Sequence, residues 1–202
     1  MGTTIGILLF DELEELDAIG PWEVFTMAAQ QQEGVRVVTI AERPERVRCA
    51  KGLRILPDHG FDDAPPLDVL LVPGGQGTRR EIDNGALLDW IRKVAAECRW
   101  LTSVCTGALL LCEAGLAKGA RVTTHWGYLP TLRERYPETQ VLEQQRYVHD
   151  GKLVTAGIDM ALWLVGQQWG VPCARDVQRA MEYEPAPPYG GPGLMQWGPG
   201  LG

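Results

Sequence analysis

Cys105 is the residue of this 202-residue chain whose position in the sequence most clearly favours chemistry. It follows a β-rich run, Trp100–Val104, and precedes an apolar helical pattern around Leu109, with Gly107 between them. A strand that turns directly into a helix needs a tight turn, which glycine tolerates because it has no Cβ. Free N–H groups at the helix N-terminus favour a negative charge, so we expect a lowered thiol pKa and a nucleophilic thiolate. The arrangement corresponds to the nucleophile elbow of serine hydrolases. The alternative is a small buried cysteine without chemistry.

Asp17 is the second candidate catalytic residue. It lies in the loop that follows the first predicted strand, Thr3–Phe10. A carboxyl group placed beside a thiolate is pushed toward its protonated form, because burial and like charge both raise its pKa. It could then act as a general acid and base for the thiol or for a substrate. The structural alternative is that Asp17 caps a helix whose first turn contains Pro21.

Backbone N–H groups and one histidine complete the candidate site. A Pro-Gly-Gly loop follows the predicted buried strand Leu67–Val72. The N–H groups of Gly74, Gly75 and Thr106 could together stabilise a developing negative charge, although such a loop can equally be a simple turn. His125, at the end of a short predicted strand, is a candidate base for the thiol, and a hydrogen-bonded structural role is the stronger expectation.

Cofactor-binding patterns are missing from the sequence. The five cysteines show no CxxC spacing, and His59 and His149 have no carboxylate or cysteine neighbours at ligand spacing. The glycine-rich loop lacks the spacing of the phosphate-binding motifs. We therefore expect neither a metal nor an organic cofactor.

The composition argues against several classes of partner and location. The formal net charge is −7, from 19 basic and 26 acidic residues, which does not suit a nucleic-acid or anionic-membrane surface. No apolar run reaches the roughly 20 residues of a membrane helix, and no signal-peptide pattern opens the chain. An odd number of unpaired cysteines fits a reducing cytoplasm. The expected partner is a small-molecule substrate.

The elements that must position these residues alternate between strands and helices. This alternation predicts a single doubly wound α/β domain with a mostly parallel sheet, followed by a Pro/Gly-rich tail. In such a sheet, ligands bind beyond the carboxyl ends of the strands at a topological switch, where the three candidate loops should meet. Strands are expected at Thr3–Phe10, Val35–Ala41, Leu53–Leu56, Leu67–Val72, Trp100–Val104 and Val122–His125, with a hairpin of Val141–Tyr147 and Lys152–Thr155 around Asp150 and Gly151; helices are expected from about Pro21 to Gln31, at Ile82–Cys98, after Cys105, and at Leu129–Arg135, Ile158–Trp169 and Val171–Tyr183.

Several strings resemble the ThiJ/PfpI superfamily, which has a class I glutamine-amidotransferase-like, flavodoxin-like fold. They are IGILLF and LDAIGPWEVF near the start, DVLLVPGG in the middle, LTSVCTGALLL and RVTTHW around Cys105, and HDGKLVT, AGIDMALWLV and EYEPAPPY later, and they span Ile5 to Tyr189. Within the superfamily, Ser103–Gly107 followed by Thr123–Trp126 resembles the isocyanide hydratase branch. The resemblance implies a domain over residues 1–184, a tail over residues 185–202 and a homodimer.

The resemblance also implies roles for single residues. Cys105 matches the family nucleophile, and Asp17 matches the acid that replaces, in this branch, the glutamate of other members. Thr106 stands where many superfamily proteases have a histidine, so a Cys-His dyad is absent at that position. Backbone N–H groups near Gly75 and Thr106 match those that face the substrate, and His125 stands near the superfamily's strand-end histidine. One departure is that the small-residue segment that relatives carry after the strand ending at Thr155 is missing or shortened here.

Three functions follow from these observations. The first is hydration of an isocyanide to an N-substituted formamide through a thioimidate on Cys105, with Asp17 as the acid. The second is a small-molecule or redox sensor related to the N-terminal domains of AraC-type regulators, an interpretation weakened because no helix-turn-helix pattern follows Tyr189. The third is another ThiJ/PfpI activity on carbonyl compounds or in stress protection, whose proteins use a glutamate where Asp17 stands.

Overall fold

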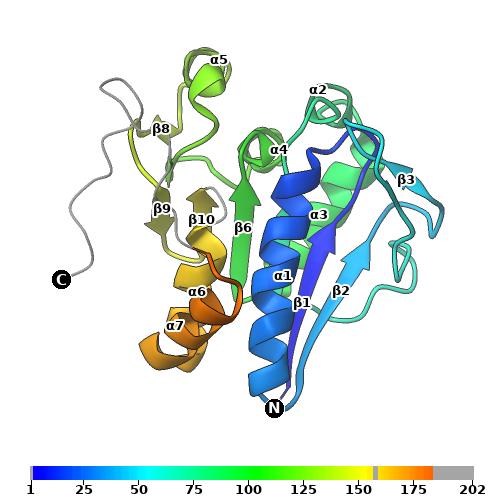
Figure 1. Ribbon diagram of the computed structural model, residues 1–202. Coiled ribbons are helices and arrows are strands. Elements are labelled where there is room, and N and C mark those ends of the chain that lie inside the picture. The colour runs from blue at the N-terminus through cyan, green and yellow to red at the C-terminus, as the bar shows by residue number, and fades with distance from the viewer. Residues whose placement is uncertain (1, 157–158, 184–202) are drawn as a thin grey trace.

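A six-stranded sheet forms the centre of the computed structural model, which describes residues 2–156 and 159–183 (Figure 1). Neighbouring strands are parallel except at one edge, where β9 runs antiparallel to β10. This confirms the predicted single α/β domain with a mostly parallel sheet. In spatial order the strands are β2 (Val35–Ile40), β1 (Thr3–Leu8), β5 (Val69–Val72), β6 (Trp100–Val104), β10 (Leu153–Ala156) and β9 (Tyr147–Asp150).

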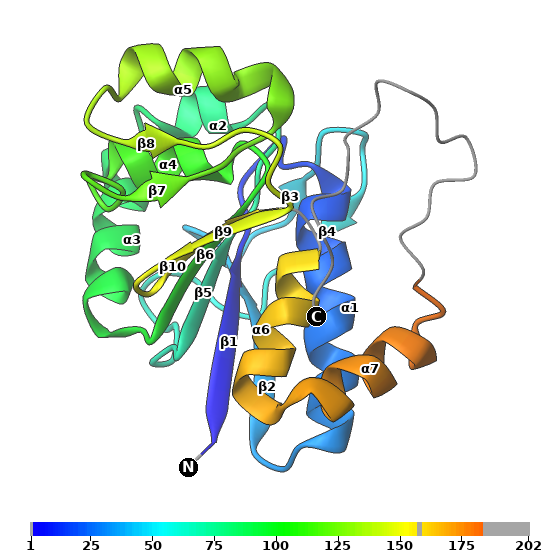
Figure 2. The same cartoon turned by 90° about the vertical axis from the view of Figure 1, so that its left-hand side faces the viewer.

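Helices cover both faces of the sheet (Figure 2). On one face α1 (Glu15–Gln31) packs against α6 (Asp159–Trp169) and α7 (Val171–Ala180), and on the other lie α3 (Gly85–Glu97) and α4 (Gly107–Glu113). Because both faces are covered, all four residues of β5 are apolar and fully buried, and the polar Thr102 and Ser103 of β6 are buried as well.

The carboxyl ends of β1 and β6 point toward the end of the molecule that carries α2 (Thr78–Glu81) and α5 (Leu129–Arg135) (Figure 1). A single turn of 3₁₀ helix, η1 (Trp126–Tyr128), leads into α5. The strand order changes direction between β1 and β5, because β2 lies on one side of β1 and β5 on the other. The topological switch therefore falls where the candidate loops were expected to meet.

α1 begins at Glu15, so the prediction that Pro21 would lie in its first turn is wrong. Pro21 lies inside the helix, where it cannot donate to the carbonyl of Asp17 because proline has no N–H. The helix nevertheless continues through Pro21 to Gln31. Asp17 is therefore not the N-cap, which is Glu14.

Two short sheets replace elements that were predicted differently. β7 (Arg121–Val122) pairs in parallel with β8 (Gln140–Val141), so the strand expected over Val141–Tyr147 is wrong and β9 begins only at Tyr147. β3 (Val47–Arg48), which was not among the expected strands, pairs with β4 (Arg54–Ile55), which lies within the expected strand Leu53–Leu56. Both pairings join segments with weak local strand patterns, so tertiary contacts decide them.

Two predicted features lie outside the described residues. The segment after Thr155 that is expected to be shortened extends into residues 157–158, and the Pro/Gly-rich tail covers residues 185–202. Within the described part of the chain, no helix is both long and apolar enough to cross a membrane. All five cysteines are free thiols.

Candidate active site

Three segments meet beyond the carboxyl ends of β1, β5 and β6, and Asp17 lies in the first turn of α1 rather than in the loop where it was expected. Asp17 follows β1, Gly74 and Gly75 follow β5, and Cys105 follows β6. The N–H of Glu14 donates to the carbonyl of Gly74 at 2.9 Å, and the N–H of Gly74 donates to Asp17 Oδ2 at 3.1 Å. The structure thus brings the predicted acid and the predicted glycine loop into direct contact.

Cys105 occupies a strained turn between β6 and α4. Its φ is 51°, in the left-handed region that a non-glycine residue adopts only at a cost of about 1 kcal/mol or more. Gly107 allows this turn because a Cβ on it would lie 2.2 Å from the carbonyl oxygen of Val72. The Thr124 hydroxyl donates to the carbonyl of Cys105 at 2.9 Å, which fixes the turn from the other side. The geometry is that of the predicted nucleophile elbow.

The Cys105 thiol contacts the carboxyl group of Asp17 and both the N–H and the hydroxyl of Thr106. Burial, and after it the negative charge of Asp17, raise the pKa of the Cys105 thiol to about 12, while the two Thr106 donors act in the opposite direction. The predicted lowering of the thiol pKa is therefore wrong. Burial and an adjacent carboxylate outweigh the N–H groups that the helix end supplies.

Asp17 is almost fully buried beside the thiol, with 8% of its surface exposed. Burial raises the pKa of Asp17 from its ordinary value of 3.8 to about 6, although hydrogen bonds from Gly74 and Cys105 lower it. At neutral pH the two groups together hold one proton, which rests on the sulfur. The ionised carboxylate is then a base in contact with the thiol proton.

The two glycine N–H groups hold the acid and the threonine in place. Gly74 donates to Asp17, and Gly75 donates to Thr106 Oγ1 at 3.0 Å, so neither N–H faces an open position. A Cβ on Gly74 would lie 2.5 Å from the Thr106 nitrogen and 2.8 Å from Asp17 Oδ2. Glycine is therefore required at position 74 for the close approach of these groups, and the role of these N–H groups toward a substrate stays a prediction.

His125 has a structural role in its own turn. Its side chain is exposed, and its Nδ1 accepts the N–H of Gly127 at 3.2 Å, which caps η1. The ring packs against Trp126, with the ring centroids 5.3 Å apart. Among the described contacts of Cys105, none is to His125.

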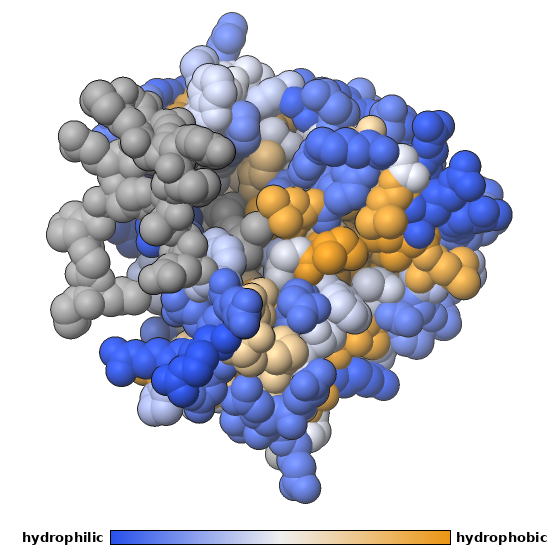
Figure 3. All heavy atoms as spheres, in the orientation of Figure 1, coloured by the Kyte–Doolittle hydropathy of each residue, from blue (hydrophilic) through white to orange (hydrophobic). Residues whose placement is uncertain are grey.

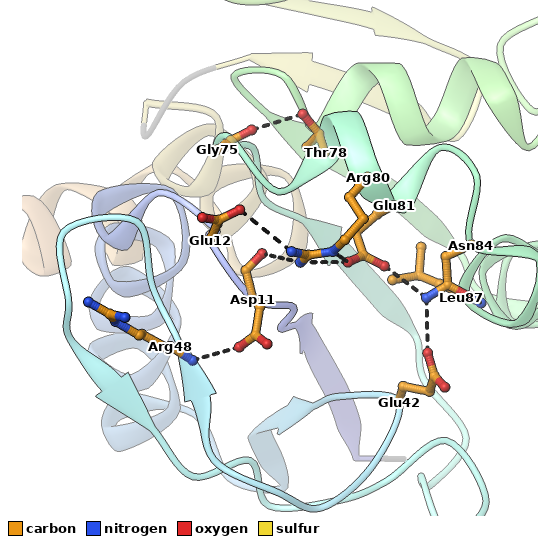
Figure 4. Close-up of polar contacts among 10 residues, drawn as sticks. All are labelled: Asp11, Glu12, Glu42, Arg48, Gly75, Thr78, Arg80, Glu81, Asn84 and Leu87. Atoms are coloured by element: carbon orange, nitrogen blue, oxygen red, sulfur yellow. Dashed lines mark hydrogen bonds and ion pairs between the residues drawn. The ribbon is translucent and has the colours of Figure 1, made fainter.

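Sequence reasoning missed two residues of α2 that hold the Gly75 carbonyl. Thr78, fully buried, donates its hydroxyl to this carbonyl at 2.8 Å (Figure 4), and Arg79 donates to it through Nη1. The only signal was the Thr-Arg pair directly after the glycine loop, and no motif marks it.

For metals, the residues that the structure describes contain no cluster of three or more His, Cys, Asp or Glu side chains suited to an ion.

Comparisons with known proteins show what the chain is similar to in sequence and in fold. The profile of the DJ-1/PfpI family matches residues 3–164. An isonitrile hydratase from Pseudomonas putida is 41% identical over 197 residues, which cover 94% of this chain and 82% of the relative. The HTH-type transcriptional regulator GbdR of Pseudomonas aeruginosa is 30% identical over 189 residues, 90% of this chain but 51% of the regulator, so the chain spans about half the regulator's length. A solved ThiJ/PfpI family protein from Pseudomonas syringae superposes with a TM-score of 0.85 at 28% identity, covering 94% of this chain and 78% of that one.

Proposed function

The chain belongs to the DJ-1/PfpI family, and from this premise we propose that it is an isocyanide hydratase that uses Cys105 as its nucleophile. The observation that carries the mechanism is the contact between the buried Asp17 carboxyl group and the thiol in the strained elbow. The 41% identity to an isonitrile hydratase, over most of both chains, supports the substrate class. The similarity to GbdR extends over only 51% of that regulator, so the sensor function has weaker support.

In the first step, the sulfur of Cys105 attacks the terminal carbon of the isocyanide. The thiol proton passes to the Asp17 carboxylate as the carbon–sulfur bond forms, and Asp17 then gives this proton to the same carbon. The product is a thioimidate, R–N=CH–S–Cys105, formed by net addition of S–H to one carbon. No oxidant, reductant or metal takes part in this balance.

In the second step, water adds to the thioimidate carbon and the carbon–sulfur bond breaks. Asp17 passes one proton of the attacking water to the imidate nitrogen, which gives R–NH–CH(OH)–S–Cys105, and then passes the hydroxyl proton to the departing sulfur. The formamide R–NH–CHO leaves and the thiol is restored. The N–H and hydroxyl of Thr106 stabilise the sulfur whenever it carries negative charge. The sum is addition of one water to the isocyanide.

The proposal is tested with an aryl isocyanide and purified protein. Wild type should form the N-aryl formamide, and Cys105→Ala should not. Formation of the formamide at equal rates by both proteins would refute the mechanism. Absence of turnover by wild type, with tight binding of a small molecule, would instead support the sensor function.

We also propose a homodimer that buries an apolar surface beside α1. The surface, which we call the α1 patch, consists of side chains on α1 and near β4 that are 38–70% exposed (Figure 3). Next to it lies a groove of about 280 Å³ whose lining includes Ile55 and Asp58. Exposed apolar clusters of this kind mark protein interfaces. The members of the patch are Leu16, Ile19, Trp22, Leu53 and Leu56.

The dimer is tested by sedimentation of wild type and of Leu56→Glu, which places a charge on the most exposed member of the patch. We expect a dimer for wild type and a monomer for the variant; a dimer in both would place the interface elsewhere.

We further propose a cytoplasmic location, which the five free thiols support.

A further inference from the structure

Arg79 is a half-buried arginine whose hydrogen bonds go to neutral groups. Its Nη1 donates to the Gly75 carbonyl and, at 3.3 Å, to the Thr78 hydroxyl, while its Nε donates to the hydroxyl of Tyr128. The guanidinium also lies 4.1 Å from the centre of the Tyr128 ring. Within residues 2–156 and 159–183, no carboxylate forms an ion pair with Arg79. The Arg79 guanidinium therefore bonds to the Gly74–Gly75 loop, whose N–H groups donate to Asp17 and Thr106.

The next residue, Arg80, provides the contrast. It pairs with Glu12 and Glu81 and donates to the carbonyl of Asp11, so it ties α2 to the loop after β1 (Figure 4). Its bonds do not include Gly75 or Thr106. The two arginines lie on the same helix, but Arg80 pairs with carboxylates, whereas Arg79 bonds to the Gly75 carbonyl and to hydroxyl groups.

The Gly75 carbonyl receives more donors than it has lone pairs. It accepts from the Thr78 hydroxyl at 2.8 Å, from the Thr78 N–H at 3.3 Å, from Arg79, and from the Thr106 hydroxyl at a long 3.3 Å. A carbonyl oxygen has two lone pairs, and a charged donor makes the stronger bond. The Thr106 hydroxyl has a single hydrogen, and its neighbouring acceptors are this carbonyl, the Thr78 hydroxyl oxygen at 3.3 Å and the Cys105 sulfur. The Thr78 hydrogen already goes to the Gly75 carbonyl, so the carbonyl and the sulfur are the competing acceptors.

We propose that Arg79 is a positioning residue that occupies the Gly75 carbonyl and thereby directs the Thr106 hydroxyl to the Cys105 sulfur. Tyr128 holds the guanidinium in place by its hydroxyl and its ring. The inference rests on the proposed role of Cys105 but not on the identity of the substrate.

Other charged groups around the thiol are separate from this effect. Asp17 of α1 faces the sulfur directly, while Glu14 and Lys51 act on Asp17 and pair with each other. His125 is exposed, and its ring accepts the N–H of Gly127. None of these groups bonds to Arg79 in the described structure, so a change at Arg79 leaves their bonds intact.

The test is the rate at which iodoacetamide modifies Cys105, followed by mass spectrometry of the Cys105 peptide. Without Arg79, the Gly75 carbonyl loses its charged donor and competes more strongly for the Thr106 hydrogen, so the thiolate loses one donor. In Arg79→Met we expect modification at pH 8 to slow about ten- to a hundredfold, because the loss of one hydrogen bond to a charged group raises a pKa by about one to two units. In the control Arg80→Met the rate should change less than about twofold. A loosened site would expose the thiol and speed the reaction, so a faster rate in Arg79→Met overturns the proposal.

The route through Thr106 is tested by a double-mutant cycle. In a Thr106→Val background, which lacks the hydroxyl, Arg79→Met should change the rate of modification less than about twofold. A slowing as large as in the wild-type background would mean that Arg79 acts by its charge alone, and it would overturn the proposal. Arg79→Lys, which keeps a charged donor near Gly75, should restore most of the rate.

A second variant covers the case in which Arg79→Met does not fold. Tyr128→Phe removes only the hydroxyl that receives Nε, and it should slow modification about twofold in the same direction. An unchanged or faster rate would overturn the proposal. Because modification needs no isocyanide, failure of the hydratase assay and failure of this inference are separate results.

Discussion

A partly buried cysteine, Cys105, precedes α4, and a buried one, Cys112, lies near the end of the helix, so the two sites can be compared directly. Burial raises the pKa of Cys112, in the last turn, to about 12, as it does for Cys105 before the first turn. Cys112 has the Thr139 hydroxyl beside it and the charge of Glu113 nearby, whereas Cys105 contacts a buried carboxylate. Thiol acidity alone therefore does not distinguish the two sites.

The difference lies in the proton acceptor and in the backbone. Cys105 sits at φ 51° in a turn held by Gly107 and Thr124, and its proton can move to Asp17. Cys112 lies in regular helix, and its thiol interacts with the Thr139 hydroxyl, which is not a base at neutral pH. We therefore attribute the reactivity of Cys105 to a base in contact with its thiol. The following variants change either the two thiols or the groups around Cys105.

The largest effect should come from removing each thiol in turn. Cys105→Ala should lower isocyanide turnover at least about a thousandfold, because no nucleophile remains. Cys112→Ala should keep turnover within about threefold of wild type and cost about 1 kcal/mol of stability, as small core truncations do. Steady-state kinetics with thermal or denaturant unfolding measure both. Equal losses of turnover would mean that the two cysteines do not differ in function.

The next effect should come from forcing the acid and the elbow apart. In Gly74→Ala, the new Cβ would meet the Thr106 nitrogen at 2.5 Å and Asp17 Oδ2 at 2.8 Å. We expect about a hundredfold loss of kcat with about 2 kcal/mol of destabilisation. Gly85→Ala is the matched control, because a Cβ there meets nothing within 4 Å, and it should leave kcat unchanged. A fully active Gly74→Ala would show that the spacing of Asp17 and Thr106 does not matter.

A smaller effect should appear in stability. The folded-state pKa of Asp17, about 6, lies above its ordinary value of 3.8, so its contribution to stability is fully present below that ordinary value and is lost as the pH rises through about 6. Asp17→Asn should therefore be about 1–3 kcal/mol more stable than wild type at pH 7 and no more stable at pH 3.5. Urea unfolding at the two pH values measures this. A less stable variant at pH 7 would contradict the burial of an ionised carboxylate.

The sequence predicted best where the pattern is local. β6 (Trp100–Val104) and α5 (Leu129–Arg135) have the predicted bounds, because an apolar strand run and a helix stopped before Pro137 need no distant information. The start of α1 was missed because a proline near a helix start was assigned to the first turn, although the helix tolerates it further in. The pairing of β7 with β8 joins segments far apart in the chain, which no local pattern shows.

The candidate site divides in the same way. The chain order sufficed to predict that Asp17, Gly74 and Cys105 meet, because parallel strands bring their carboxyl ends to one edge of the sheet. The direction of the thiol pKa shift could not be predicted, since it depends on how deeply the sulfur is buried and on its contact with Asp17. Arg79 was missed because it bonds to the backbone carbonyl of Gly75. Every residue has such a carbonyl, so no residue type in the sequence marks this acceptor.

In the proposed mechanism, Asp17 raises the pKa of the Cys105 thiol and yet serves as the base that activates it. This dual role is tested most directly by titrating the thiolate absorbance of Cys105 in wild type and in Asp17→Asn, together with isocyanide turnover. We predict that Asp17→Asn lowers the thiol pKa by about one unit or more while turnover falls at least about a hundredfold. A thiol pKa that rises in Asp17→Asn, or turnover that persists, would contradict the account.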